Sequence, residues 1–478
     1  MAAGEFEIDA EVNPYRVSVF GSSVANGQGA SNFQGYAYLY GKQLEKRTAD
    51  GESAYPLHIS GVSIGGNTTR NLLDRYDDML HDFGHYVMIG LSLGNEGIHG
   101  AANPENVFAG FRDNMLTLIA QMRADGKEPV VVNNYTRGDY NDADYGYVKR
   151  MNMLIHEWDL PSVNVLGAID DGAGHWAEGY IADDAHPNLQ GHNEFMYAIV
   201  PSLFDALVAG KPLPERDMTG SYTLTGGKTL AMTGEGTVHP FTISLRIKGT
   251  DAGRILKFEH GARKQYSGSL TVNADGTLTY DSPLKDPVTT VDAALADGDW
   301  HDVTLTHFYA MGKTFVYIDG VLKGEVSERL TLGEVVIGDA ENAGVSRDIS
   351  EVSFWRSGMN AEELAAHHAG KMLKSSLEIY SPMHIENNSF ANKAQSMNEL
   401  VVKQGKPAGI GAVEGTAATF HAEGGAGVIR LSGDAAGTVT VCRADGAMVA
   451  NVEASEMPKE IAAAPGVYLV NNFKVVVK

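Results

Sequence analysis

Strand and helix patterns alternate over the first 210 residues, and this alternation constrains the fold more than any other feature. Short apolar runs predict five strands, at 15–20, 57–59, 86–89, 129–132 and 163–166. Apolar residues at helical spacing predict helices near 36–44, 103–126 and 148–158, and a last one carrying Phe195, Ile199, Leu203 and Leu207. A parallel sheet with helices on both faces buries such strands. Ligands of these sheets bind beyond the carboxyl ends of the strands, so we expect a site in the loops that come after them.

The sequence pattern changes after residue 210, from alternating strands and helices to short strands alone. A polar segment with two prolines, 211–217, predicts a linker, and short alternating runs such as 242–247 and 314–318 come after it. Turn signals between these runs are typical of an all-β sandwich. We therefore predict a multidomain protein: an α/β/α domain at 13–210, a β-sandwich at 218–405 and a small β domain at 411–478.

Charge and cysteine content exclude several classes of function. The chain has 37 basic and 60 acidic residues, a net charge of −23, which argues against a nucleic-acid partner. A local arginine could still bind an acidic sugar. No apolar run is long enough to span a bilayer, so we expect no membrane insertion. The single cysteine, Cys442, rules out an intrachain disulfide, as in the cytosol or in an envelope protein without bridges.

Two short motifs supply a hydroxyl and a histidine with a carboxylate. Ser23 follows the first strand, where a serine can attack a carbonyl when a histidine removes its proton. His186 lies three residues after Asp183, so the carboxylate can reach one ring nitrogen while the other faces the nucleophile. Asp184 is a rival for the carboxylate role. Turn and cap chemistry is the alternative for each motif. No cluster of metal ligands stands nearby, and we expect no metal.

Two further motifs could stabilise an oxyanion. Gly66 with Asn67, and Asn95 after Gly94, each combine an accessible backbone N–H with a neutral amide donor. Glycine and asparagine are also the default residues of turns, which is the alternative.

In combination, these pieces resemble the SGNH, or GDSL-type, hydrolase family. The match is carried by 19–23, Gly61 to Thr68, 94–96 and Asp183-x-x-His186-Pro187, within about residues 13–209. The resemblance implies a flavodoxin-like fold and hydrolysis of esters or thioesters without a cofactor. It implies that Ser23 is the nucleophile, His186 the base and Asp183 its orienting carboxylate. The implied oxyanion donors are Ser23, Gly66 and Asn95. Ser22 stands where the family usually has aspartate, and Gly65 could replace Gly66.

The later regions carry weaker resemblances. Segments 299–305, 315–320 and 349–355, followed by a short helix near 361–364, resemble a laminin-G-like, concanavalin-like jelly roll. Such modules bind glycans or act as spacers. The C-terminal end, 466–478, resembles the small β domains on secreted Bacteroidetes proteins.

We expect an esterase that removes acetyl groups from a decorated carbohydrate, so the partner is a small-molecule or glycan ester. The carbohydrate part rests on the accompanying domains alone. Asn67, His175 and Trp176 are predicted to bind substrate, although Trp176 could instead pack its loop onto the domain. A lipid or thioester hydrolase and a non-catalytic glycan-binding protein remain alternatives. Residues 1–10 are mostly small and acidic, as in a trimmed mature end, and we expect a periplasmic or secreted protein.

Overall fold

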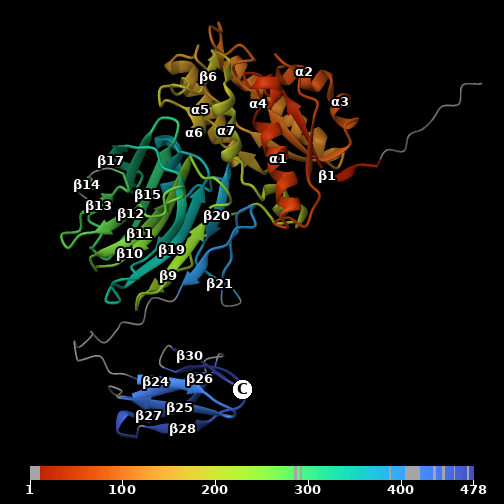
Figure 1. The fold of residues 1–478 in the computed structure, drawn as a ribbon. Coiled ribbons are helices and arrows are strands. Elements are labelled where there is room, and N and C mark those ends of the chain that lie inside the picture. The colour runs from red at the N-terminus through yellow and green to blue at the C-terminus, as the bar shows by residue number, and fades with distance from the viewer. Residues whose placement is uncertain are drawn as a thin grey trace, which may run out of the picture. The chain divides into compact units, whose positions relative to one another are not determined.

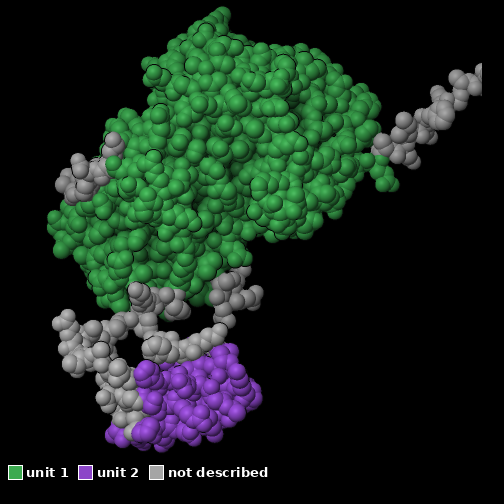
Figure 2. Space-filling model, in the orientation of Figure 1, with its two compact units in different colours: residues 1–408 green, residues 409–478 purple. Residues whose placement is uncertain are grey.

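The computed structural model describes residues 11–284, 288–290, 293–386, 389–403, 420–433, 438–443, 447–456, 458–470 and 473–478. The chain divides into two compact units, residues 1–408 and 409–478 (Figure 2). The predicted α/β domain and β-sandwich lie together in the first unit. The predicted trimmed end at 1–10 and the start of the third domain at 411–419 lie outside the described residues. Among the helices that the structure describes, none has the length and apolarity needed to cross a bilayer.

A five-stranded parallel sheet forms the centre of the α/β region (Figure 1). Its strands are β1 (Asn13–Gly21), β2 (His58–Gly61), β3 (Gly84–Gly90), β4 (Glu128–Val132) and β5 (Ser162–Val163). The order β2-β1-β3-β4-β5 is that of a doubly wound, flavodoxin-like sheet. The sequence prediction of a parallel α/β sheet is therefore confirmed.

Helices cover both faces of this sheet, because alternate strand residues point to opposite sides. The helices are α1 (Tyr36–Ala49), α2 (Thr69–Asp74), α3 (Tyr76–Leu80), α4 (Pro104–Ala124), α5 (Asp142–Glu157), α6 (Leu166–Ile169), α7 (Leu189–Tyr197) and α8 (Leu203–Val208), with a 3-10 turn, η1 (Ser31–Phe33). Val17 and Val19 of β1 pack in one apolar cluster with α1 and α7, whereas Phe20 packs with α2 and α4 in the other.

Two sequence predictions for this region are wrong in detail. The fifth strand ends at Val163, and Leu166 begins α6 instead of closing the strand. The predicted last helix is broken into α7 and α8 around Pro201. Proline has no N–H to donate and disfavours helical geometry at the residue before it, which explains the break.

Two seven-stranded antiparallel sheets come next in the first unit. One contains β8 (Tyr222–Leu224), β10 (Phe241–Lys248), β15 (Trp300–Phe308), β16 (Lys313–Ile318), β17 (Val321–Ser327), β19 (Arg347–Trp355) and β20 (Leu377–Ser381). The other contains β9 (Thr229–Thr233), β11 (Gly253–His260), β12 (Ser267–Val272), β13 (Leu278–Asp281), β14 (Val288–Thr290), β18 (Leu332–Ile337) and β23 (Val401–Lys403). α9 (Ala361–His368) and a small hairpin, β21 (Ile385–Glu386) with β22 (Ser389–Phe390), complete the region. The laminin-G-like assignment stays a prediction.

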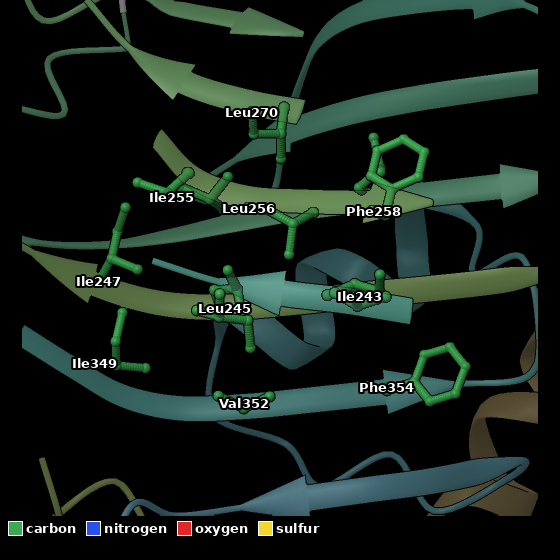
Figure 3. Packing of buried hydrophobic residues seen from close by; sticks show 14 of the residues in the cluster. Ile243, Leu245, Ile247, Ile255, Leu256, Phe258, Leu270, Ile349, Val352 and Phe354 are labelled. Atoms are coloured by element: carbon green, nitrogen blue, oxygen red, sulfur yellow. The ribbon is translucent and has the colours of Figure 1, made fainter. Parts of the chain in front are cut away.

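Alternation along the strands builds the core of this sandwich. Ile243, Leu245 and Ile247 of β10 are buried in one apolar cluster with Leu256 and Phe258 of β11 (Figure 3). The intervening hydroxyl residues of β10 point to the other face, where they bond to threonines of β15. This period of two is what the sequence pattern predicts for a half-buried strand.

The second unit is a small antiparallel β structure with its own apolar cluster. Its strands are β24 (Phe420–Gly424), β25 (Val428–Gly433), β26 (Thr438–Arg443), β27 (Met448–Glu453), β28 (Lys459–Ala462), β29 (Gly466–Val470) and β30 (Phe473–Val477), with a 3-10 turn, η2 (Ala454–Glu456).

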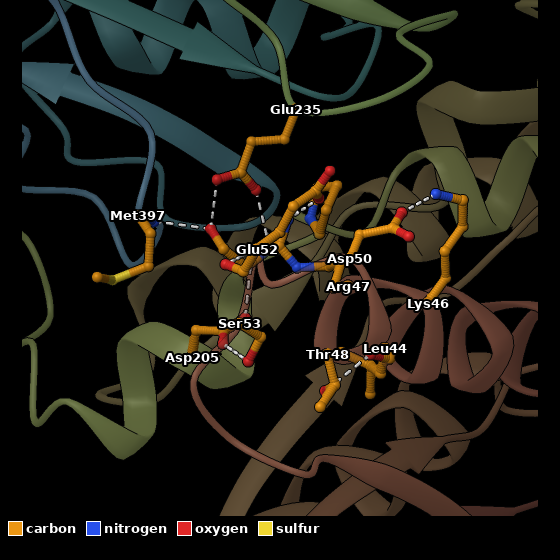
Figure 4. Close-up of polar contacts among 12 residues, drawn as sticks. Leu44, Lys46, Arg47, Thr48, Asp50, Glu52, Ser53, Asp205, Glu235 and Met397 are labelled. Carbon is orange, nitrogen blue, oxygen red and sulfur yellow. Dashed lines mark hydrogen bonds and ion pairs between the residues drawn. The ribbon is translucent and has the colours of Figure 1, made fainter.

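Buried polar contacts join the α/β region to the sandwich. Ser376 covers the outer edge of β5: its N–H donates to Ser162 O at 3.0 Å, and its Oγ accepts from Asn164 N at 2.8 Å. Arg356 donates through Nε to Tyr197 O, at the carboxyl end of α7, at 2.7 Å. Figure 4 shows a further contact area, where Glu235 and Met397 lie beside Arg47 and Asp205. The polar segment 211–217 therefore leads into a domain that is attached through many side chains.

Candidate active site

Three side chains from two loops form a continuous hydrogen-bonded chain. His186 Nε2 lies 2.9 Å from Ser23 Oγ, and His186 Nδ1 lies 2.8 Å from Asp183 Oδ1. Ser23 follows β1, whereas the histidine and the aspartate come from a late loop. The structure thus brings the three predicted triad residues together. With a carboxylate on one nitrogen of the ring, the other nitrogen is free to accept a proton from the hydroxyl.

A small hairpin holds the histidine and its carboxylate. β6 (Ile181–Asp183) pairs with β7 (His186–Pro187), and Asp183 lies opposite His186 in this pairing. Asp183 also accepts a hydrogen bond from Ala185 N at 2.9 Å, which closes the turn. Partial burial pushes the pKa of Asp183 upward, but the bonds from Ala185 and His186 outweigh it and hold that pKa below its usual value. The carboxylate is therefore ionised whenever the hairpin is formed near neutral pH.

Asp184 does not take the carboxylate role in this geometry. Its backbone carbonyl accepts hydrogen bonds from Gly138 N at 2.8 Å and from Trp176 Nε1 at 3.0 Å. Its side chain is exposed, and Asp183 contacts the ring nitrogen of His186 with both carboxylate oxygens. The two carbonyl contacts anchor the hairpin to neighbouring loops.

The loop after Ser23 packs directly on this hairpin because it contains a glycine. Gly29 has φ +98°, and a Cβ at this position would lie 1.9 Å from Pro187 O. His192 of α7 ties the same loop down: its Nδ1 accepts from Tyr36 N at 3.2 Å, and its Nε2 donates to Gln28 O at 2.9 Å. Burial lowers the pKa of His192 to about 4, so the ring is neutral and can make both bonds.

The predicted oxyanion donors are Ser23, Asn95 and a glycine of the 61–68 motif. Asn95 Nδ2 donates to Asn67 O at 3.0 Å, which fixes the amide and leaves its second N–H free. Among the described residues, Ser23 N has no acceptor. A Cβ added at Gly65 would lie 3.8 Å from Ser23 Cβ, whereas one added at Gly66 would meet nothing within 4 Å. The structure therefore places Gly65 beside Ser23, the alternative that the length of this motif left open.

Arg75 organises the motif that carries Asn67. Its Nε donates to Asn67 Oδ1 at 2.5 Å, its Nη1 to Val62 O at 2.6 Å, and its Nη2 to Gly21 O at 3.3 Å. The amide oxygen of Asn67 is thus bonded within the protein, and its backbone carbonyl orients Asn95.

The two remaining predicted residues have different surroundings. His175 is partly exposed, and its Nε2 contacts Tyr140 O at 2.9 Å. Trp176 is only 6% exposed and stacks on Tyr135 with 5.8 Å between the ring centroids. Its buried ring faces the core and cannot present its face to a sugar, so this geometry favours the packing alternative for Trp176.

A group of potential metal ligands lies in the part of the sandwich that the structure describes, away from Ser23 in the sequence. Asp302, Asp319 and His368 have ligand atoms within 4.8 Å of one another. His368 Nδ1 contacts Asp302 Oδ2 at 2.5 Å, and Arg246 approaches the same carboxylate at 3.3 Å. Internal pairing and a neighbouring cation account for these charges, so the group does not require a metal.

Sequence reasoning missed Gly29, Arg75 and His192, which position the site without carrying its chemistry. Gly29 stands in a loop with other glycines, where nothing distinguishes it. His192 follows His186 by six residues, and on the predicted helix it lies on the same face as Phe195 and Ile199, which was the available signal.

Comparison with known proteins adds a family assignment for this part of the chain. Residues 19–193 match the model of the GDSL-like Lipase/Acylhydrolase family. A comparison with curated proteins gives no match.

Solved structures with similar parts include a catalytic mutant of Axe2, an acetylxylan esterase from Geobacillus stearothermophilus. That likeness has 14% identity and a TM-score of 0.33, and covers 38% of this chain and 91% of that one. A putative lipolytic protein of the G-D-S-L family from Desulfitobacterium hafniense has 11% identity and a TM-score of 0.32, with 38% and 95% covered. An SAP-like pentraxin from Limulus polyphemus has 18% identity and a TM-score of 0.28, with 40% and 95% covered. From the family match, residues 19–193 form a hydrolase domain of the GDSL, or SGNH, type.

Proposed function

We propose that this protein is a serine esterase that removes acetyl groups from a decorated carbohydrate. The observation that carries the proposal is the uninterrupted contact from Asp183 through His186 to Ser23 Oγ, at 2.8 and 2.9 Å. A nucleophile within hydrogen-bond distance of a base, with the base oriented by a carboxylate, is the requirement of acyl transfer. This intact contact argues against a purely non-catalytic glycan-binding protein.

The proposed reaction has two halves. His186 Nε2 accepts the proton from Ser23 Oγ while that oxygen attacks the ester carbonyl, and the protonated ring then donates to the departing alcohol oxygen. Water, deprotonated by the same nitrogen, attacks the acyl-enzyme and releases the carboxylic acid, and Ser23 recovers its proton. The negative oxygen formed in each half accepts from Ser23 N, from the free N–H of Asn95, and from Gly65 or Gly66.

The identity of the substrate rests on the surroundings of the site. Polar and small residues flank Ser23 and the His186 hairpin, and a β-sandwich is attached through buried contacts. This setting suits a hydrophilic glycan ester better than a lipid.

One cavity favours a second candidate, the hydrolysis of longer acyl chains. A cavity of about 290 Å³ lies beside the loop that follows Ser23, and its lining combines apolar with charged residues: Ala25, Phe33, Ala37 and Ile59 with Lys42 and Glu45. Phe33 is 58% exposed there and offers apolar surface to a ligand.

A substrate screen separates these candidates. We expect purified protein to hydrolyse acetylated oligosaccharides and p-nitrophenyl acetate, with kcat/KM falling as the acyl chain of the chromogenic ester lengthens. A rise in kcat/KM towards eight or more carbons would favour the lipid or thioester candidate. No turnover of any ester by protein that is folded by circular dichroism would overturn the esterase proposal.

A further inference from the structure

The first unit contains a cavity between its α/β region and its sandwich, here called the junction cavity. Its volume is about 420 Å³, within the range of about 300–1,000 Å³ typical of small-molecule sites. One wall comes from Tyr180 and from Gln190, Asn193, Glu194 and Tyr197 of α7. The other wall comes from His239, Tyr309 and Arg329 of the sandwich.

We propose that the junction cavity binds the uncharged carbohydrate chain that carries the scissile ester, as a subsite beside Ser23 and His186. This inference rests on the proposed function, because it assigns a place to the glycan part of the same substrate. It goes beyond that function by naming the residues that would recognise the chain.

The position of the cavity is set by the elements around the hairpin. Tyr180 directly precedes β6, and Gln190 is the second residue of α7, which follows β7. Asn188 N donates to Tyr180 O at 2.8 Å, so this wall is tied to the start of α7. Three residues of extended backbone span roughly 10 Å, so the Cα atoms of Tyr180 and Asp183 lie within about that distance of each other. The proposal therefore requires the sugar chain to pass from the cavity over this hairpin to Ser23.

One face of α7 provides the length of the subsite. Gln190, Asn193, Glu194 and Tyr197 have the three- and four-residue spacing that places side chains on one side of a helix. This stripe runs for roughly 10 Å along the helix axis, since each residue adds 1.5 Å. Arg356 bonds to the last carbonyl of α7 and the hairpin precedes its start, so the stripe is held at both ends.

Aromatic rings supply the apolar surfaces that sugars need. Tyr309 stacks on His239 with 3.7 Å between the ring centroids and 10° between the planes. Tyr197 meets the same histidine edge to face at 4.8 Å. A sugar ring has apolar C–H faces and polar edges, which match aromatic rings bordered by hydrogen-bonding groups. Because the rings already pack on one another, little order has to be gained on binding.

The polar groups of the cavity have unused bonding capacity. Among the described residues, the hydroxyls of Tyr180, Tyr197 and Tyr309 and the amides of Gln190 and Asn193 have no side-chain hydrogen bond to protein. Five neutral groups that can both donate and accept suit the hydroxyls of a sugar.

The charges of the cavity largely offset one another. Glu194 is 5% exposed and contacts His239 Nδ1 at 2.9 Å, and the cationic Arg329 shares the lining with the anionic Glu178. Arg329 is anchored by bonds to Tyr309 O and Ala310 O at 3.2 and 3.1 Å. Neither charge dominates, which favours an uncharged chain over an acidic one.

Binding without hydrolysis tests the subsite first. The probe is an array of unesterified plant and microbial oligosaccharides, applied to the whole chain carrying Ser23→Ala. We expect at least one oligosaccharide to bind, and the double variant Gln190→Ala with Asn193→Ala to weaken that binding about thirtyfold, because it removes two hydrogen-bonding groups. Gln121→Ala, an exposed glutamine on α4, is the matched control and should change nothing.

A tyrosine pair gives a second comparison. Tyr309→Ala should weaken glycan binding by roughly three- to tenfold, whereas Tyr266→Ala, an exposed tyrosine of the sandwich outside the cavity, should have no effect. The double amide variant leaves the stacked rings intact, so the test stands even if Tyr309→Ala disturbs folding.

Kinetics separates failure of the subsite from failure of the proposed function. In otherwise wild-type protein, the cavity variants should lower kcat/KM for acetylated oligosaccharides through KM and leave p-nitrophenyl acetate unchanged. The subsite would be overturned if the cavity variants changed kcat/KM equally for both substrates, or if they left oligosaccharide binding unaffected. It would also be overturned if no oligosaccharide bound. Glycan binding that depends on the cavity, in a protein that hydrolyses no ester, would retain the subsite and reject the proposed function.

Discussion

Two histidine–carboxylate pairs in the first unit have nearly the same contact and different surroundings. His186 Nδ1 lies 2.8 Å from Asp183, and His239 Nδ1 lies 2.9 Å from Glu194. Asp183 is 58% exposed with its pKa lowered, whereas burial raises the pKa of Glu194 despite the bond from His239. His186 has the hydroxyl of Ser23 on its other nitrogen, whereas among the described residues no hydroxyl bonds to His239 and its ring stacks on Tyr309. A histidine–carboxylate contact alone therefore does not indicate catalysis. The informative feature is the group beside the second ring nitrogen, which for His186 is the hydroxyl of Ser23.

Removing that hydroxyl should give the largest effect. Ser23→Ala leaves His186 paired with Asp183, as His239 is paired with Glu194, but without a nucleophile. We expect kcat for any ester to fall roughly 10⁴-fold or more, with an unchanged melting temperature. Steady-state kinetics on p-nitrophenyl acetate measures the loss. Near-normal turnover by this variant would place the nucleophile elsewhere.

The two histidines should respond very differently to truncation. His186→Ala removes the base and should cost about as much in kcat as losing Ser23, because the residues act as a unit. His239→Ala is the matched change at the other pair and should leave kcat on p-nitrophenyl acetate within about twofold of wild type. Comparable losses of kcat in both variants would show that the Ser23 hydroxyl beside His186 does not set the two histidines apart in catalysis.

The carboxylates should give a smaller difference. Asp183→Asn keeps the shape but disturbs the tautomer and orientation of His186, and we expect kcat to fall roughly 10²–10³-fold, below the loss of about 10⁴ known for a buried triad aspartate. Asp184→Asn next to it is the control and should be almost silent. Should Asp184→Asn be the damaging change, the carboxylate role belongs to Asp184.

The proposed oxyanion donors belong to the His186 pair alone, and Asn95 tests their contribution. Asn95→Ala should lower kcat about 10²–10³-fold with little change in KM, because its bond to the substrate oxygen strengthens in the transition state. A change confined to KM would instead make Asn95 a ground-state binding residue.

A third histidine, His192, has no carboxylate and should matter through stability. Burial lowers its pKa from 6.5 to about 4, so the folded state disfavours the charged ring. The contribution of His192 to stability is therefore greatest above about pH 6.5 and falls by about 3 kcal/mol as the pH drops towards 4. Urea unfolding at pH 7.5 and 4.5 measures the fall, and His192→Gln should lessen it. An unchanged pH dependence in the variant would exclude His192 as its source.

The sequence predicts which residues form the candidate site better than how the protein holds them in place. Ser23, Asp183 and His186 lie in short motifs whose types and spacing are informative, and the family match at 19–193 confirms the GDSL-type domain. The break at Pro201 had a visible signal, because proline ends helices. The parallel sheet is predictable because short apolar runs alternate with apolar residues at helical spacing.

Other features depend on contacts between distant residues. Gly29 is required because the His186 hairpin approaches it, and Asn95 is oriented by the carbonyl of Asn67, 28 residues away in the sequence. The burial of Trp176 depends on Tyr135, and the junction cavity on residues from two regions of the chain. Local sequence patterns carry no information about such approaches.

The bond from Ser376 to the outer edge of β5 has a consequence for how this protein can be divided. An uncovered edge strand offers its free N–H and C=O groups to any other chain and promotes aggregation. Cutting the chain near residue 210 would remove Ser376 and expose Ser162 O and Asn164 N. We therefore expect the hydrolase domain to remain soluble only when it is expressed together with the sandwich. A rearranged gene that keeps the hydrolase domain should keep the sandwich as well.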